Sequence, residues 1–183
     1  LAEFYDSYFQ TFITDSDVFT DEKILKVLGL TSFFFSIDRS DKKFYDELLS
    51  DFEINHYEFT EACVHLERLE LLESTADNTI IRISDQVLSA YFFYRVFLKE
   101  KLLDFSKLLS NYFERYPNRF RDTLIPANND FGYQKVLQPI REELSSYLNS
   151  IITYQRKVHA FLDIFWFYLN EETFAFIYSQ VEH

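Results

Sequence analysis

Histidine and cysteine side chains are the first candidates for chemistry in this sequence, because they bind zinc and act as bases or nucleophiles. Four histidines are present, and His56 and His65 lie nine residues apart on one predicted helix. Nine residues advance a helix by two and a half turns, so the two rings should face opposite sides. The single cysteine, Cys63, excludes an internal disulfide and a cysteine zinc cluster. It lies on an apolar helical stripe, so we expect a buried, inert thiol and no metal site.

Nucleotide-binding and acid–base motifs are missing from the sequence. A phosphate-binding loop needs several glycines close together, whereas the two glycines, Gly29 and Gly132, lie far apart. No serine or cysteine has the spacing of a recognisable nucleophile motif. Acid pairs recur at Asp15 and Asp17, Glu142 and Glu143, and Glu171 and Glu172. Solvated helix faces account for such pairs, so we predict no catalytic machinery in this chain.

The net charge of the chain indicates which kinds of partner it can bind. The chain of 183 residues carries 30 acidic and 18 basic residues, a net charge of −12, which disfavours nucleic acids and anionic membrane surfaces. It has no apolar run of transmembrane length and one cysteine, which predicts a cytoplasmic protein. It contains no methionine and begins at Leu1, so we expect it to be part of a longer chain.

Few glycines and prolines, with many leucines, glutamates and lysines, favour a mainly α fold. Residues 1–12 have the periodicity of the end of a helix. Thr20 is a predicted N-cap for a central helix, in which Gly29 allows close packing. Ser40 should cap the next helix, and Asn55 should open a third, with Glu58 at the capping-box spacing.

Residues 69–74 and 79–84 are predicted strands around a turn at Thr75–Asn78. Three helices followed by a small β-hairpin wing are typical of a winged helix. Ser84 should then cap a long helix, and further helices are expected at 105–115, at a short segment ended by Pro126, and at 133–149, 151–168 and 171–182. We therefore expect three parts: residues 1–19 as the end of a preceding helical segment, 20–97 as the winged helix, and 98–183 as an α-helical hairpin or bundle region.

The helix that would read DNA in this fold has the wrong charge. Between Asn55 and Ser74 there is one permanent cation, Arg68, and the acids are Glu58, Glu61, Glu67, Glu70 and Glu73. A helix in the major groove needs cations for phosphates, so we interpret this winged helix as a protein-packing module. Aromatic runs at 91–97 and 161–169 should mainly be core. The alternative interpretation of these aromatic runs is a surface that docks a neighbouring protein domain, with Tyr91, Phe92, Tyr94 and Trp166 as candidates.

Residues 23–38, 58–74, 81–109 and 161–177 together resemble the winged-helix region, and the helices after it, of bacterial STAND-type signal-transduction NTPases, which are related to the AAA+ class. In that family a P-loop ATPase domain and its helical lid precede the winged helix, so residues 1–12 would be the end of the lid. The resemblance implies no cofactor in this part and ATP or ADP in the parent protein. Many prokaryotic members act in defence against phage.

The family often has a Met-His-Asp motif after the wing, whose histidine touches the ADP phosphate. Ile83-Ser84-Asp85 occupies that place, so the resemblance makes Ser84 and Asp85 candidates for nucleotide sensing. Serine replaces the histidine and cannot supply a switchable charge, and plain helix capping is the competing interpretation.

These observations predict a regulatory and scaffolding module that packs on the ATPase domain and relays its nucleotide state. Neighbouring domains of the parent chain would be its partners, or a second copy in a homo-oligomer, with no nucleic acid and no membrane. Two alternatives remain: a winged-helix transcription regulator that binds DNA, and a stand-alone protein-interaction domain.

Overall fold

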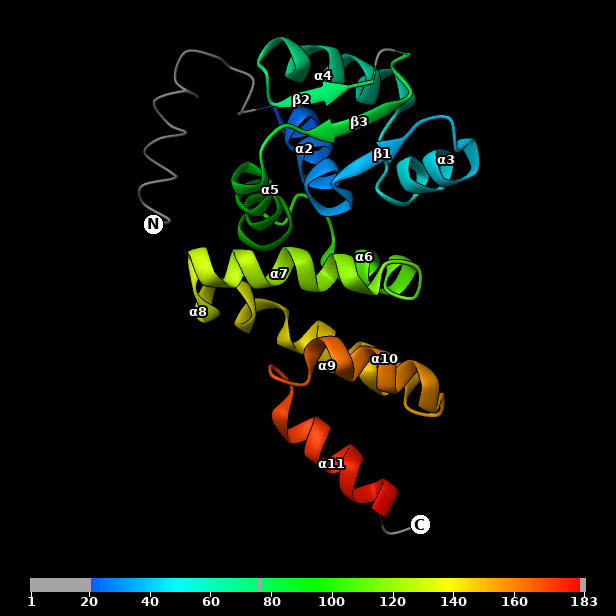
Figure 1. Cartoon of the computed structure of the whole chain (residues 1–183), viewed down its shortest axis with the longest axis vertical. Coiled ribbons are helices and arrows are strands. Elements are labelled where there is room, and N and C mark those ends of the chain that lie inside the picture. The colour runs from blue at the N-terminus through cyan, green and yellow to red at the C-terminus, as the bar shows by residue number, and fades with distance from the viewer. Residues whose placement is uncertain (1–20, 76, 182–183) are drawn as a thin grey trace.

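The computed structural model describes residues 21–75 and 77–181, and their fold is mainly helical with a small three-stranded antiparallel sheet (Figure 1). The sheet and the last helix lie at opposite ends of the longest axis. The expectation of a mainly α fold is confirmed. Residues 1–19, expected to end a preceding segment, and the predicted cap Thr20 lie outside the described residues.

The first elements are three helices and three short strands that form one sheet. The strand order is β1-β3-β2, so β3 is central, with Ile37 opposite Ile81 and Glu73 opposite Arg82. The two predicted strands are present as β2 and β3. The elements are α2 (Glu22–Phe34), β1 (Ser36–Asp38), α3 (Lys42–Asp51), α4 (His56–Arg68), β2 (Leu72–Ser74) and β3 (Ile80–Ile83).

Strand β1 was not predicted, because the aromatic run before it has helical periodicity. Helix α2 ends at Phe35, whose φ of 66° lies in the left-handed region that a bulky residue rarely adopts. This reversal sends Ile37 into the core, where it is fully buried and paired with β3. Pairing with a distant strand therefore overrides the local tendency to continue the helix.

Two of the helices in this part begin one residue later than predicted. Ser40 is not a cap, because the Asp41 carboxylate accepts the N–H of Phe44 at 3.1 Å and so caps α3. Asp21 caps α2 in the same way, with the N–H of Lys23 at 2.8 Å. The cap predicted at Asn55 is confirmed.

The long helix predicted after the wing is interrupted. Helix α5 (Gln86–Phe93) continues as a π-helix, η2 (Tyr94–Lys99), and the chain turns before α6 (Phe105–Tyr112). The Asp104 carboxylate starts α6 by accepting the N–H groups of Ser106 and Lys107. The domain boundary that we expected after residue 97 therefore falls inside η2 and not in a linker.

The remaining helices differ from the prediction at prolines and at Gly132. Pro126 lies inside α7, although it was expected to end a helix, and the helix buries Leu124 and Ala127 there while Ile125 stays exposed. The predicted helix at 133–149 is divided after Val136 by a 3-10 turn that contains Pro139, while Gly132, with φ of 86°, separates it from α7. The elements are α7 (Pro117–Phe131), α8 (Tyr133–Val136), the 3-10 helix η3 (Gln138–Ile140), α9 (Arg141–Ile151), α10 (Gln155–Phe165) and α11 (Asn170–Val181).

One hydrophobic core runs through the sheet-containing part (residues 21–93) and the helical part (residues 105–181). The Phe33 ring lies 4.7 Å from that of Phe120, and the Phe34 ring 5.1 Å from that of Tyr112. Polar contacts reinforce this junction: Tyr112 Oη donates to Asp51 Oδ2 at 2.8 Å, and Lys107 Nζ donates to the Asp51 carbonyl at 2.7 Å. Any displacement of one part must therefore carry the other with it.

Gly29 has the close-packing role expected of it. A Cβ at this position of α2 would lie 2.5 Å from Cγ1 and 2.8 Å from Cβ of Val96 in η2. Both helices are buried here, so the missing side chain sets how closely α2 and η2 approach. None of the helices in the described ranges combines the length and the apolar character needed to cross a bilayer.

Candidate functional site

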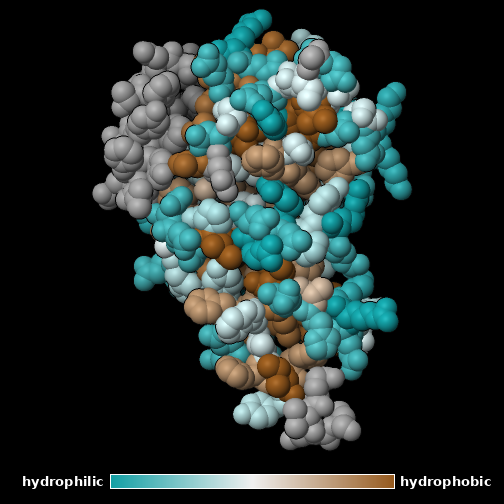
Figure 2. Space-filling model, viewed as in Figure 1, coloured by the Kyte–Doolittle hydropathy of each residue, from teal (hydrophilic) through white to brown (hydrophobic). Residues whose placement is uncertain are grey.

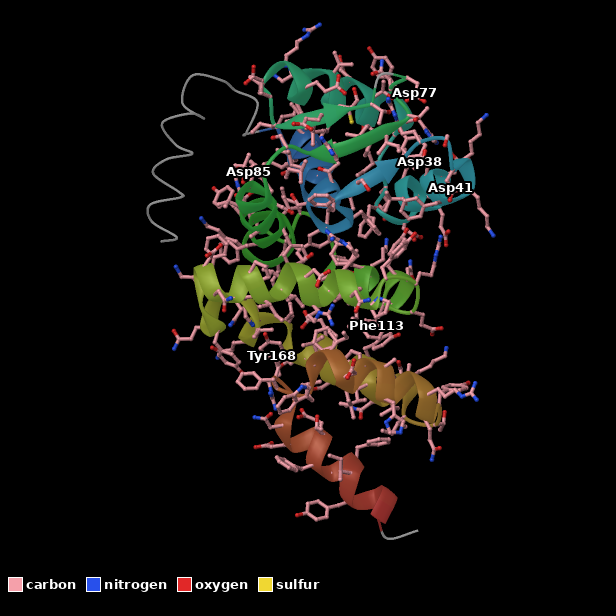
Figure 3. All side chains as sticks on the ribbon, in the orientation of Figure 1. Asp38, Asp41, Asp77, Asp85, Phe113 and Tyr168 are labelled. Carbon is pink, nitrogen blue, oxygen red and sulfur yellow. The ribbon has the colours of Figure 1, made fainter. Side chains whose placement is uncertain are left out.

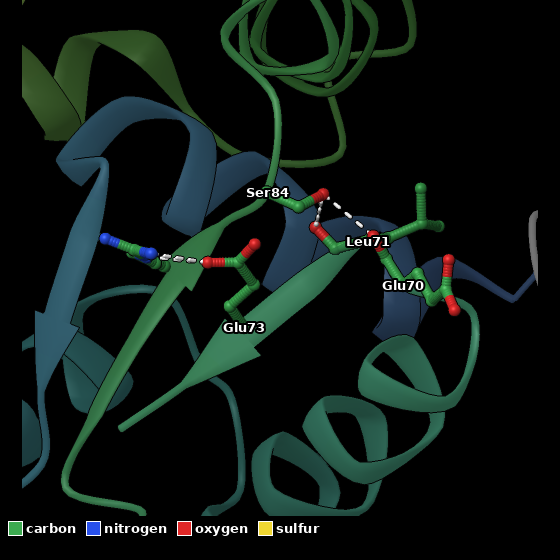
Figure 4. Close-up of polar contacts among 5 residues, drawn as sticks. Glu70, Leu71, Glu73 and Ser84 are labelled. Atoms are coloured by element: carbon green, nitrogen blue, oxygen red, sulfur yellow. Dashed lines mark hydrogen bonds and ion pairs between the residues drawn. The ribbon is translucent and has the colours of Figure 1, made fainter. Parts of the chain in front are cut away.

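Ser84 and Asp85 lie where the chain leaves β3 and enters α5 (Figures 3 and 4). The Ser84 hydroxyl donates to the carbonyl oxygens of Glu70 and Leu71, at 2.8 and 3.1 Å. The Asp85 carboxylate accepts the N–H groups of Val87 and Leu88 and is the N-cap of α5. The prediction that Ser84 caps this helix is therefore wrong, because the carboxylate of the next residue performs that role.

These contacts do not suit a phosphate. A serine hydroxyl has one proton, and here carbonyl oxygens accept it. The neighbouring residue Asp85 is acidic, and the one cation drawn near this turn, Arg82, pairs with the Glu73 carboxylate at 2.6 Å (Figure 4). The nucleotide-sensing role of Ser84 and Asp85 stays a prediction, and the geometry gives both residues structural roles instead.

Replacing Asp85 by alanine should lower the free energy of unfolding by about 1 kcal/mol, because α5 loses its capping acceptor. Asp85→Asn keeps that acceptor and should cost only a few tenths of this amount, about 0.3 kcal/mol. Urea titrations of both variants beside the parent protein measure the difference. Equal losses in the two variants would contradict the capping role.

The outward face of α4 is the second candidate region. Besides the first residue, His56, its exposed residues are Tyr57, Thr60, Glu61, Val64 and Arg68, which lie along one side of the helix. Tyr57 is 72% exposed and Val64 is 44% exposed, so both contribute apolar surface to this face. The face holds one acid and one base, so it is nearly neutral and partly apolar, as a protein contact is.

Nearby groups reduce the positive charge around α4 further. Lys23 Nζ contacts Glu58 Oε1 at 2.6 Å, and this hydrogen bond raises the pKa of Lys23. Glu58 is therefore paired with α2 and not with the backbone N–H of a capping box. In the turn between β2 and β3, the Asp77 carboxylate accepts from the hydroxyls of Thr75 and Thr79, which lowers its pKa and keeps it ionised.

Three of the four residues proposed for docking are in the interior. Tyr91, Phe92 and Tyr94 are all buried, with the Tyr94 ring stacked on Phe131 at 4.4 Å. They contribute to the core, as the first interpretation of the aromatic run had it, and form no surface. Trp166 is 55% exposed at the end of α10.

The sequence did not indicate which other apolar side chains are exposed. Phe167, Phe174, Ile177 and Tyr178 are exposed on α11 and the turn before it, and apolar surface is visible at this end of the molecule (Figure 2). Helical spacing could have placed Phe174, Ile177 and Tyr178 on one face, but spacing alone cannot tell an outward face from a buried one.

Cys63 lies in α4 and is buried against the core, as expected. Burial raises the pKa of its thiol to about 12, so the reactive thiolate is scarce at neutral pH. We expect a thiol reagent such as a disulfide dye to label the native protein far more slowly than the protein in denaturant. Rapid labelling of the native protein, followed by absorbance, would contradict this.

Within the described residues, no cluster of three or more His, Cys, Asp or Glu side chains could hold a metal ion.

Comparison of the chain with protein-family models, with curated proteins and with solved structures found no match.

Proposed function

We propose that this chain is a non-catalytic regulatory and scaffolding module of a larger STAND-like NTPase. In this proposal the elements from α2 to β3 form a winged helix. Three helices, a hairpin and a sheet in which β3 lies between β1 and β2 support that assignment. The module would pack on the ATPase domain, which holds ATP or ADP, and the parent would act in a switch such as anti-phage defence.

The outward face of α4 is the observation that carries the proposal. A helix that reads DNA would present cations there, whereas this helix presents Tyr57 and Val64 beside a balanced acid and base. An exposed tyrosine on such a face is typical of a residue that anchors a protein contact. The continuous core behind α4 supports the relay, because it couples this face to the helical part.

The first test is the reading frame of the parent gene. We expect a P-loop to be encoded upstream of residue 1, and a parent protein without one would overturn the proposal.

In the full-length protein, Tyr57→Ala combined with Val64→Ala should change the rate of nucleotide release, because the face is proposed to contact the ATPase domain. Asn111→Ala, an exposed change on α6, is the matched control and should leave that rate unchanged.

A second test separates this proposal from DNA binding. Fluorescence anisotropy with a labelled random duplex at about 150 mM salt should show no binding by the chain below about 100 µM, because its charge repels phosphates. Tighter binding that weakens steeply with salt would favour the transcription regulator.

A further inference from the structure

A cleft of about 470 Å³ lies between the end of α2, helix α5 and helix α7. Figure 1 shows α5 and the end of α2 on the same side of α7. Phe35, Ile125 and Pro126 supply apolar walls, and Arg119 and Thr123 supply polar groups. A cleft of this size and mixed lining is typical of a site for a small molecule.

Arg119 is the group in this cleft with hydrogen-bonding capacity to spare. Its Nε donates to the carbonyl of Phe33 at 2.9 Å, and its guanidinium lies 5.5 Å from the centre of the Phe35 ring. Among the described residues, no carboxylate forms an ion pair with it and its two terminal amino groups donate no hydrogen bond. The side chain is half-buried, and burial lowers its pKa. The Asp122 carboxylate nearby partly offsets this lowering, and an anion that met the two terminal amino groups would stabilise the charge further.

The position of Phe35 strengthens this interpretation. The φ of 66° at this residue is unfavourable for an aromatic side chain and persists only where the surroundings require it. The result is a ring that is held over the guanidinium and remains 42% exposed at the cleft. It orients the plane of Arg119 and offers a face to a ligand.

The charge of the cleft matches a single negative charge. Arg121 Nε pairs with Asp122 Oδ1 at 3.3 Å, so these two lining residues largely compensate each other. Arg119 is then the remaining positive charge of the lining. A phosphate with two charges would be in excess and would face Asp122, whereas a carboxylate has one charge and two oxygens that suit a guanidinium.

A hydroxyl group is available beside it. Thr123 is 4% exposed and lines the cleft, and its hydroxyl has no hydrogen-bond partner in the part of the chain that the structure describes. The Ser89 hydroxyl, by contrast, donates to the carbonyl of Ser32 at 2.8 Å and has no proton left for a ligand. An oxygen ligand in this cleft would therefore find its donors at Arg119 and Thr123.

We propose that this cleft is a binding site for a small carboxylic acid with an apolar ring or chain. The two terminal amino groups of the Arg119 guanidinium donate to the carboxylate oxygens, and the Thr123 hydroxyl donates to one of these oxygens. The apolar body of the ligand packs against Phe35, Ile125 and Pro126. Carboxylate binding would hold whether or not the chain belongs to an NTPase.

Phenylacetate, its neutral amide phenylacetamide and inorganic phosphate are the probes for the test. Isothermal titration calorimetry should give a dissociation constant of about 1 mM for phenylacetate, a value suited to one ionic contact and one small apolar group. Backbone amide signals of Ala90 and Thr123 should shift in NMR spectra, since both residues line the cleft. Phenylacetamide and phosphate should bind at least about tenfold more weakly, because one lacks the charge and the other the apolar body.

Variants assign the interaction to named groups. Arg119→Gln should weaken phenylacetate binding at least about tenfold, and Thr123→Val should weaken it about threefold. Arg156→Gln removes the same charge from an exposed site on α10 and is the matched control. Asp122→Asn should tighten binding, because a repulsive charge is removed, and a misfolded variant would not show such a gain.

Three results would overturn the proposal: equal binding of the amide, tighter binding of phosphate, or an unchanged affinity in both Arg119→Gln and Thr123→Val. Circular dichroism establishes that each variant is folded. If Arg119→Gln does not fold, the Thr123→Val and Asp122→Asn affinities decide the outcome.

Discussion

The Phe113→Ala variant is expected to lose about 3–5 kcal/mol of unfolding free energy, the range for truncating a large buried aromatic side chain. Phe113 is 2% exposed and lies at the junction of α6 with the helices below it (Figure 3). Its ring centre lies 5.2–5.9 Å from those of four other rings, namely Phe120, Tyr147, Phe161 and Phe165. Alanine would leave a cavity that these rigid neighbours cannot fill.

Phe174→Ala is the matched control for that variant. It makes the same chemical change at a position on α11 that is 60% exposed, and it should cost less than about 0.5 kcal/mol. Equilibrium unfolding in guanidinium chloride measures both variants. A loss below about 1 kcal/mol for Phe113→Ala would mean that this junction is not packed as described.

The Gly29→Ala variant, which adds one methyl group, is expected to show the second large change in unfolding free energy. In an open helix, Gly→Ala stabilises the protein by up to about 1 kcal/mol. Here the new Cβ would meet Val96 at 2.5 Å, so α2 and η2 must separate, and we expect a net loss of about 1–3 kcal/mol. The sign of the change is therefore opposite to the one that helix propensity predicts.

A double-mutant cycle tests this cause. Val96→Ala removes the nearest methyl group and should recover part of the loss in Gly29→Ala, although the contact at 2.8 Å with the Val96 Cβ remains. Gly132→Ala provides the control, because its cost comes from φ of 86°, with open space around the added atom. Val96→Ala should recover nothing there. Additive losses in the Gly29 cycle would refute the steric explanation.

Local chemistry in the sequence located most helices but placed several starts one residue early. Serine followed by aspartate occurs at Ser40-Asp41 and Ser84-Asp85, and in both cases the aspartate is the cap. Both residue types cap well, so composition cannot choose between them. The choice depends on where the preceding strand ends, and Ser84 is occupied by the loop after α4.

Long-range contacts explain what the sequence could not show. Strand β1 exists because β3 pairs with it, and α7 continues through Pro126 as a helix that packs Leu124 and Ala127 into the core. The carboxylate cleft brings Phe35 beside Arg119, two residues with no relation in the sequence pattern. The acidic composition of α4, by contrast, was evident from the sequence, since the numbers of acidic and basic residues in a helix do not depend on its tertiary contacts.

The core that crosses from the sheet-containing part into the helical part also bears on how such a chain can evolve. Phe33 and Phe34 face Phe120 and Tyr112, so a change of ring size on one side requires an answering change on the other. The two parts are therefore expected to be inherited together, and recombination between them would join surfaces that no longer fit. Independent exchange by recombination is instead expected for domains that contact the outward face of α4 or the exposed apolar side chains of α11.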